Sequence, residues 1–365
     1  MAMSRCIRDL YNVDYAGASK LTKYGVTATT NTSVNAYDLA EYLNRVDLGN
    51  KNIYEVLPIN GGKNNEANPS DEATLDIQCA AGLGAGNAGF YALGINNTQI
   101  WAFEDNLLTL ASYLATADDA PAVISNSFGI DEEFVTQSYA VRICNDFMKA
   151  CSRGVTVLCS TGDSGVGNRC DGGKFRNHFP ASCSYVLAVG ASYWKGTVET
   201  AARFGSGGGF SDYFTTPDYQ KTDVQNYRHD HIPAAYDGKF NKDGRSYPDI
   251  ALVGEQIPEV GPTKNRNNAS ETKIAVTGGT SASTPLLAGL LSQINDYRAT
   301  LKLPTLGFIN PRLYGDTKVR AAVKDITTGS NPGCNTMGLT TEKGWDPVTG
   351  LGSLDFAKLR AALST

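Results

Sequence analysis

The sequence predicts an α/β fold in which a largely parallel sheet is covered by helices on both faces. Two observations predict it. Short runs of β-branched and apolar residues recur along the 365 residues, and most are followed by turn residues and then by a helical pattern. Strand alternating with helix over most of a chain is typical of a parallel sheet that is buried on both sides.

The elements follow from these patterns in chain order. Runs that predict buried strands are Ile53–Ile59, Ala122–Phe128, Val155–Ser160, Val186–Val189 and Lys273–Val276. Apolar side chains at steps of four predict helices through Val135, Tyr139, Ile143 and Phe147 and through Leu286, Leu290 and Ile294. The region 200–270 is rich in Gly, Asn and Tyr with weak periodicity, which favours long surface loops over a linker between domains. We therefore expect residues 1–365 to form a single domain.

The composition excludes several classes of protein. Hydrophobic residues make up 41% of the chain and charged residues 19%, which supports a sizeable core and excludes a disordered or fibrous chain. The net charge of −5 gives no basic footprint for nucleic acid or anionic lipid. No apolar run is long enough to predict a membrane span.

The eight cysteines include no C-x-x-C pair, which disfavours a zinc ribbon or a thioredoxin-type motif. Cys170 could be bridged to Cys183 or, equally, to Cys334. The other cysteines of apolar-periodic segments are expected to be plain buried thiols: Cys79, Cys144, Cys151 and Cys159.

Histidine is scarce, and processing signals are few. His178, His229 and His231 are the only candidates for an ordinary histidine base, and the last two are expected at the surface. Sequons begin at Asn31, Asn96 and Asn268, which hints at a secretory route. The chain opens without a signal peptide, so we expect either a cytosolic protein or a mature chain.

The sharpest local feature is Thr277-Gly-Gly-Thr-Ser281-Ala-Ser-Thr-Pro285, a run of small residues between a predicted strand and a strongly apolar helix. Backbone N–H groups at such a helix start assist a nucleophilic hydroxyl and can receive an oxyanion. Taken alone, the segment favours a plainer role, in which Ser281 or Ser283 caps the helix.

Two further segments carry carboxylates. Ser70-Asp-Glu72-Ala-Thr-Leu-Asp76 opens a predicted helix, and the four-residue spacing puts Glu72 and Asp76 on one face. Such a pair either exploits the helix dipole or forms a site with two coupled carboxyls. Ser160-Thr-Gly-Asp163-Ser-Gly places Asp163 after a buried strand, where α/β sheets place functional groups, although an Asx-turn is an equal alternative.

Together these segments resemble the sedolisin family of serine-carboxyl peptidases, and within it the tripeptidyl peptidases of fungal secretions and animal lysosomes. The similarity covers essentially the whole chain in the family's order. Its motifs are Cys6–Asn12, Glu72–Asp76, Ser125–Gly129, Ser160–Gly165, Phe179–Ser182, Gly205–Ser211, Gly244–Asp249, Gly279–Ser283 and Gly344–Gly350.

The resemblance implies a subtilisin-like fold and a set of catalytic roles. It implies Ser281 as nucleophile, Glu72 as its base, Asp76 as the carboxyl that supports the base, and Asp163 as the acid of the oxyanion hole. A carboxylate base has an unperturbed pKa near 4, and Asp163 must be protonated to donate to an oxyanion. Both demands predict activity at acidic pH.

The resemblance also implies one structural calcium ion near the C-terminus. Its ligands would be the carboxylates of Asp325 and Asp346 and the backbone carbonyls of Ile326, Glu342 and Gly344, an all-oxygen shell suited to a hard cation. Glu342 stands where relatives often have glycine. Without the resemblance, both aspartates would be ordinary turn residues.

We therefore expect an acid peptidase that forms an acyl-enzyme on Ser281 and releases tripeptides from free N-termini. An endopeptidase of the same family and an inactive binding protein on the same fold are the alternatives. Expected partners are peptide or protein substrates and an N-terminal prosegment in the precursor, with no nucleic acid and no membrane. The expected state is a monomer in a secreted, lysosomal or vacuolar location.

Overall fold

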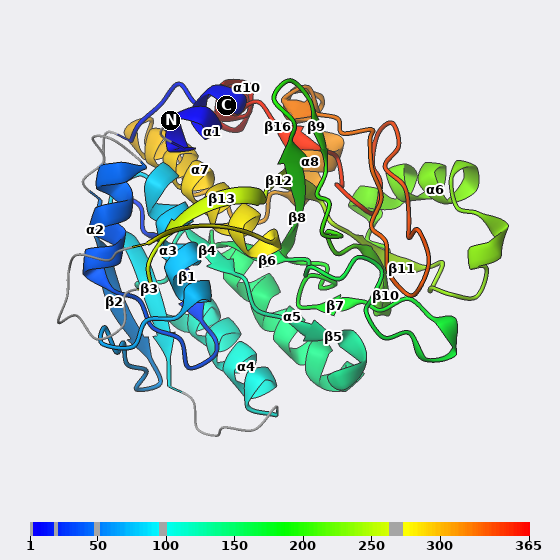
Figure 1. Cartoon of the computed structure of the whole chain (residues 1–365), viewed down its shortest axis with the longest axis horizontal. Helices are drawn as coiled ribbons and strands as arrows, with labels where there is room; N and C mark the ends of the chain where they lie inside the picture. Colours follow the sequence, from blue (N-terminus) through cyan, green and yellow to red (C-terminus); the bar gives the residue numbers. More distant parts are fainter. Residues whose placement is uncertain (1–2, 18–20, 47–51, 95–100, 263–272) are drawn as a thin grey trace.

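The central feature of the structure is a twisted sheet of parallel strands (Figure 1). The computed structural model describes residues 3–17, 21–46, 52–94, 101–262 and 273–365. Neighbouring strands pair in parallel, and the short strand β9 (Glu199–Ala201) pairs with the end of β8 in the antiparallel sense. In spatial order the parallel strands are β12 (Ile250–Val253), β8 (Leu187–Trp194), β6 (Thr156–Ser160), β4 (Val123–Asn126), β1 (Tyr24–Ala28), β3 (Ala88–Leu93) and β2 (Tyr54–Ile59).

Helices cover both faces of this sheet, as predicted. On one face α3 (Asp71–Leu83) packs against α7 (Thr280–Thr300), and on the other α4 (Trp101–Thr116) packs against α5 (Gln137–Ser152). Each face has its own apolar core, because successive strand residues point to opposite sides: Val123 belongs to the core with α3 and α7, and Ile124 to the core with α4 and α5. The sheet is therefore buried on both sides.

The remaining elements are short and lie around this framework. The further helices are α1 (Met3–Leu10), α2 (Ala36–Arg45), α6 (Lys221–Asp230), α8 (Asn310–Gly315), α9 (Thr317–Arg320) and α10 (Phe356–Leu363). Antiparallel pairs are formed by β5 (Ile130–Asp131) with β7 (His178–Phe179), β10 (Gly209–Thr215) with β11 (Gly244–Tyr247), β13 (Glu255–Val260) with β14 (Ile274–Gly278), and β15 (Val323–Lys324) with β16 (Ser353–Leu354). None of the helices in the described ranges is long and apolar enough to cross a membrane.

Two sequence predictions about strands are wrong. The region 200–270 is not a set of loops, because it contains α6 and the edge strand β12. The apolar run of β12 is short and stands in a region without periodicity, and its pairing with β8 defines it as a strand. The run Lys273–Val276 is part of a strand but not a buried one: β14 forms a hairpin with β13, and Val276 is 70% exposed.

The cysteines form two disulfides among the described residues, Cys144–Cys183 and Cys170–Cys334. The second was one of the two pairings that the sequence allowed. The prediction that Cys144 is a plain thiol is wrong, because α5 places it against the turn that carries Cys183. Cys79, Cys151 and Cys159 are buried free thiols, as expected.

His229 lies at the surface, as expected, and the sequon residue Asn31 is also exposed. His229 pairs with Asp230, although it lies on α6 rather than in a loop. The sequons at Asn96 and Asn268 lie outside the described residues.

Candidate active site

The first turn of α3 carries the two predicted carboxylates on one helix face. Ser70 occupies the N-cap position but makes no side-chain cap, and Asp71 and Glu72 supply the negative charge that a helix N-terminus favours. One turn further, Asp76 is fully buried. The four-residue spacing therefore stacks Glu72 above Asp76, and the pair reaches into the protein rather than into solvent.

Ser281 lies in the first turn of α7, directly after the strand β14. The turn between them is made by Gly279, whose φ of 135° strongly favours glycine. A methyl group there would also come within 2.8 Å of the Asp163 carboxylate. The Ser281 hydroxyl lies near the Glu72 carboxyl and lowers its pKa. Ser283 is instead buried and donates to the carbonyl of Leu252 at 2.9 Å, a structural contact.

Asp163 reaches the same helix terminus from the carboxyl end of β6. Its Oδ1 accepts the backbone N–H of Thr280 at 2.8 Å and the Thr280 hydroxyl at 3.0 Å, while the N–H of Gly162 donates to that hydroxyl at 3.0 Å. The carboxyl thus caps α7 beside the nucleophile, instead of closing an Asx-turn of its own. Asp163 and Ser127 lie at one sheet edge because they follow the adjacent parallel strands β6 and β4, whereas α7 reaches the same place after the hairpin of β13 and β14.

Asp76 is held from below by Ser127, which follows β4. The Ser127 hydroxyl donates to Asp76 Oδ1 at 2.6 Å and lies 3.4 Å from the backbone oxygen of Ser281. The other oxygen of Asp76 and the Oε1 atom of Glu72 are buried and have no hydrogen-bond partner. Two buried carboxyl oxygens without partners disfavour ionisation of both groups at once.

Burial makes the whole cluster less acidic than ordinary carboxyls. It raises the pKa of Glu72, against the lowering effect of the Ser281 hydroxyl, and Asp163 adds to the rise. Burial followed by the charge of Glu72 raises the pKa of Asp76. Burial also raises the pKa of Asp163, although the Thr280 hydrogen bonds oppose it. The structure therefore favours protons on this cluster.

A further carboxyl, Glu259 on β13, belongs to the cluster and was missed by sequence reasoning. Its side chain is buried, its Oε1 has no partner, and burial with the charges of Asp71, Glu72 and Asp38 raises its pKa to about 8. No motif surrounds Glu259, and its strand was expected to be a loop. The one available signal was an isolated acidic residue in the apolar run Ile257-Pro-Glu-Val260.

Comparison with known proteins places this arrangement in a family. The family model described as the subtilase family matches residues 61–332, a span that includes all four of these predicted catalytic residues. The chain belongs to the subtilase family. In structure this subtilase is similar to the Pseudomonas sedolisin, a serine-carboxyl proteinase solved with pseudo-iodotyrostatin, with a TM-score of 0.72 and 22% identity over 98% of this chain and 96% of that one.

The resemblance to sedolisins is also confirmed in sequence. The subtilase is 34% identical to the tripeptidyl-peptidase sed4 of Aspergillus fumigatus over 97% of its own length and 65% of that protein. It is 34% identical to tripeptidyl-peptidase 1 of Bos taurus over 80% of its own length and 51% of that protein. The chain thus spans less than two thirds of the length of these curated relatives.

The residues predicted for calcium come together in the C-terminal part of the subtilase. Asp346 is fully buried, and its carboxylate accepts the backbone N–H groups of Glu342, Val348 and Thr349. Asp325 accepts the N–H of Gly344 at 2.9 Å, which ties the two segments together. The Glu342 side chain lies toward His231, so only its backbone could face the two aspartates.

This donor set fits a hard cation. Among the described residues no basic side chain pairs with Asp346, so a divalent ion would supply the positive charge needed to balance this buried carboxylate. The described residues hold no group of three or more His, Cys, Asp or Glu side chains that could bind a metal. A calcium shell here would consequently depend on carbonyl oxygens as well as on Asp325 and Asp346.

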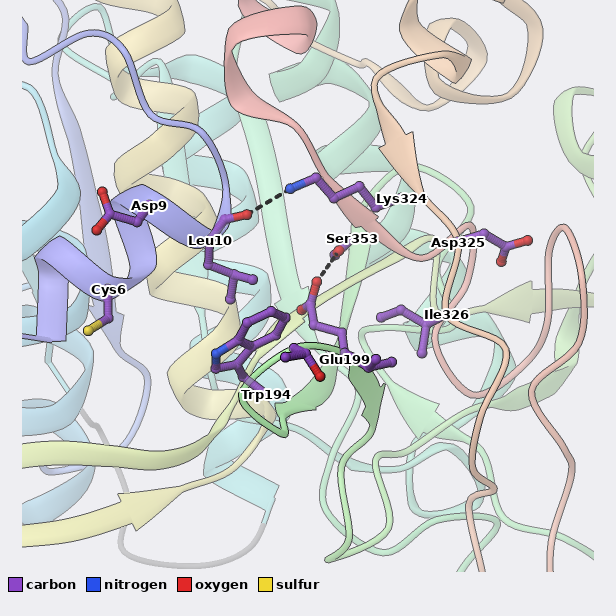
Figure 2. A pocket seen from close by; sticks show the side chains of 11 residues that line it. Cys6, Asp9, Leu10, Trp194, Glu199, Lys324, Asp325, Ile326 and Ser353 are labelled. Atoms are coloured by element: carbon purple, nitrogen blue, oxygen red, sulfur yellow. Dashed lines mark hydrogen bonds between the residues drawn. The ribbon is translucent and has the colours of Figure 1, made fainter.

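A separate hollow of about 630 Å³ lies between α1, the β8–β9 connection and the β15–β16 pair (Figure 2). Glu199 and Ser353 hydrogen-bond within it, and Lys324 donates to the backbone oxygen of Leu10 at 2.7 Å. Asp325 lines its rim but points away from this pair. The hollow therefore contains none of the proposed catalytic side chains.

Proposed function

We propose that this subtilase is a serine-carboxyl peptidase that hydrolyses peptide bonds through an acyl-enzyme on Ser281. The observation that carries the proposal is the convergence of Glu72 and Asp163 on the first turn of α7, where the Ser281 hydroxyl acts on the Glu72 carboxyl and Asp163 accepts the N–H of Thr280. A carboxylate therefore occupies the place of the base, with a second carboxyl, Asp76, buried behind it. The similarity to proteins named tripeptidyl-peptidases supports the same reaction.

In the acylation step Ser281 Oγ attacks the carbonyl carbon of the scissile bond, and its proton passes to Glu72. The tetrahedral oxyanion lies toward Asp163, which donates a proton in a hydrogen bond while remaining a neutral acid. Collapse of this intermediate breaks the C–N bond, and Glu72 returns its proton to the leaving amine. Water then attacks the ester in the same manner, with Glu72 again as base, and releases the acyl product.

The two acidic roles require opposite protonation states, which restricts the working pH. Glu72 must be ionised to accept the serine proton, whereas Asp163 must be protonated. Burial raises both pKa values, so protonated Asp163 persists into mildly acidic solution. Ionised Asp163 would place a negative charge against the developing oxyanion. We infer an activity maximum below neutral pH.

One calcium ion is proposed as a structural component, held by Asp325 and Asp346 and by the carbonyls of Ile326, Glu342 and Gly344. The ion would neutralise the two carboxylates and hold the segments that carry them together. The proposal is supported by the all-oxygen donor set and by the burial of Asp346 without a basic partner among the described residues.

An oxidising location, secreted or lysosomal, is proposed from the disulfides Cys144–Cys183 and Cys170–Cys334, because such bonds persist outside reducing compartments. The prosegment and the monomeric state stay predictions of the resemblance. The natural substrates are proposed to be peptides with free N-termini, from which the enzyme releases tripeptides.

The test is mass spectrometry of products from one long peptide prepared with a free and with an acetylated N-terminus. Sequential tripeptides from the free form alone are expected. Internal cleavage of both forms would identify the endopeptidase alternative, and no cleavage of either form between pH 3 and 6 would refute the peptidase proposal.

A further inference from the structure

His178 is a half-buried titratable residue that the proposed mechanism does not use. It lies on β7, which pairs with β5, so that His178 is opposite Asp131 (Figure 1). The backbone N–H of His178 donates to the Tyr247 hydroxyl at 2.7 Å, which fixes the strand that carries the ring. The position of the imidazole is therefore set by the framework and not by a loop.

The imidazole packs against two glycines from neighbouring strands. A methyl group built on Gly129 would come within 2.0 Å of the ring Nε2, and one built on Gly162 within 3.1 Å of Nδ1. Gly129 follows β4 and Gly162 follows β6, which are adjacent parallel strands. The ring thus occupies the space between two backbone segments that have no side chains to fill it.

Both segments adjoin the catalytic groups. Gly162 immediately precedes Asp163 and hydrogen-bonds Thr280, the residue before the nucleophile. Ser127, two residues before Gly129, hydrogen-bonds Asp76 and the backbone of Ser281. The His178 ring therefore lies against two segments that each contact the catalytic groups.

The ring is available to a substrate side chain. His178 is only half-buried, and neither of its ring nitrogens hydrogen-bonds another described residue. Burial lowers its pKa to about 4, so at pH 5 the imidazole is mostly neutral and offers one N–H donor and one acceptor.

We propose that His178 forms the floor of the pocket for the P1 residue, whose carbonyl Ser281 attacks, and restricts it to short side chains that can hydrogen-bond. This inference rests on the proposed function and adds a substrate class to it. The ring shortens the pocket against Phe, Tyr and Trp. Its unpaired nitrogens favour Asn or Ser over an apolar side chain of equal size, because a buried polar group left unpaired costs free energy.

The test compares three fluorogenic tripeptide amides at pH 5 that differ only in P1, which is Phe, Leu or Asn. Leu and Asn have nearly the same shape, so their ratio of kcat/KM reports hydrogen bonding, while the Phe-to-Leu ratio reports pocket depth. We expect the parent to disfavour Phe against Leu by about tenfold or more and to favour Asn over Leu by about fivefold.

Two variants separate the contributions of size and polarity. His178→Ala is expected to raise the Phe-to-Leu ratio by about tenfold, whereas His178→Phe keeps Phe disfavoured and loses the preference for Asn. His229→Ala, at an exposed histidine, is the matched control and should leave both ratios unchanged. A general loss of fold would lower all three rates together without moving the ratios.

The parent enzyme also tests the proposal without any variant. A kcat/KM for the Phe substrate equal to or above that for the Leu substrate would overturn it. A Phe-to-Leu ratio in His178→Ala within threefold of the parent, with Leu still cleaved, would overturn it as well. Absence of cleavage of every substrate by the parent is a different result, and it refutes the peptidase function on which the inference rests.

Discussion

Replacing Glu259 by Gln removes one titrating carboxyl from beneath the active site while keeping the size of the side chain. Glu259 is buried on β13, and one of its oxygens has no hydrogen-bond partner. The charged groups that raise its pKa are Asp71, Glu72 and Asp38, and all three are acidic. The folded protein therefore holds a proton on Glu259 more tightly than the unfolded chain does.

The magnitude follows from the shift in pKa, which rises from 4.5 to about 8 on folding. Because the folded-state pKa is raised, the associated stability is fully present below pH 4.5 and is lost as the pH rises through 8. At 1.36 kcal/mol per pKa unit, the loss between pH 4.5 and 7 is about 3 kcal/mol. Gln does not titrate, so Glu259→Gln should lack this loss.

The assay is urea-induced unfolding of the parent and of Glu259→Gln at pH 4.5 and 7.0. The difference in unfolding free energy between the two pH values should be about 3 kcal/mol smaller in the variant. Glu255→Gln is the matched control on the same strand, because Glu255 pairs with Arg203 at the surface. Equal pH dependence in the parent and Glu259→Gln would refute the assignment of a buried, protonated Glu259.

Two further predictions concern the acid of the oxyanion hole and the calcium segment. Asp163→Asn should lose on the order of 10²-fold in acylation rate at acidic pH but retain more of its own maximal rate as pH rises, because an amide donates without titrating. Pre-steady-state acylation rates of the parent and the variant from pH 3 to 7 test this, and an identical fall in rate on the alkaline side in both proteins would argue against it. Chelation at neutral pH should lower the melting temperature, because Asp325 and Asp346 would lose their shared cation. In Asp325→Asn the chelator should have no effect on the melting temperature. An unchanged melting temperature and metal content in the parent would show that the segment is a simple turn.

The sequence predicted the parallel strands β2, β4, β6 and β8 and the long buried helix that packs on them, but it missed β1, β3 and β12. The apolar patterns of the helix through Leu286, Leu290 and Ile294 and of the strand Val155–Ser160 are visible in the sequence. The four-residue strand β12 and the hairpin of β13 and β14 could not be recognised, because pairing with β8 and with each other defines them.

The residues of the candidate site also fall into two groups, those that the sequence could identify and those that it could not. Glu72, Asp163 and Ser281 stand in local motifs, so the sequence could single them out before the structure showed that they meet. Glu259 and His178 have no motif, and their roles depend on contacts between segments far apart in the chain. The Cys144–Cys183 bond was missed for the same reason, since only the fold brings α5 against the turn after β7.

The most direct measurement is identification of the acylated residue during turnover. The enzyme would be mixed with a tripeptide p-nitrophenyl ester at pH 4, quenched in strong acid within milliseconds, digested and mapped by mass spectrometry. We expect the tripeptidyl mass on the peptide that contains Ser281, and its loss in Ser281→Ala. Turnover with the adduct on another residue, or with no adduct under conditions that accumulate the acyl-enzyme, would contradict nucleophilic catalysis by Ser281.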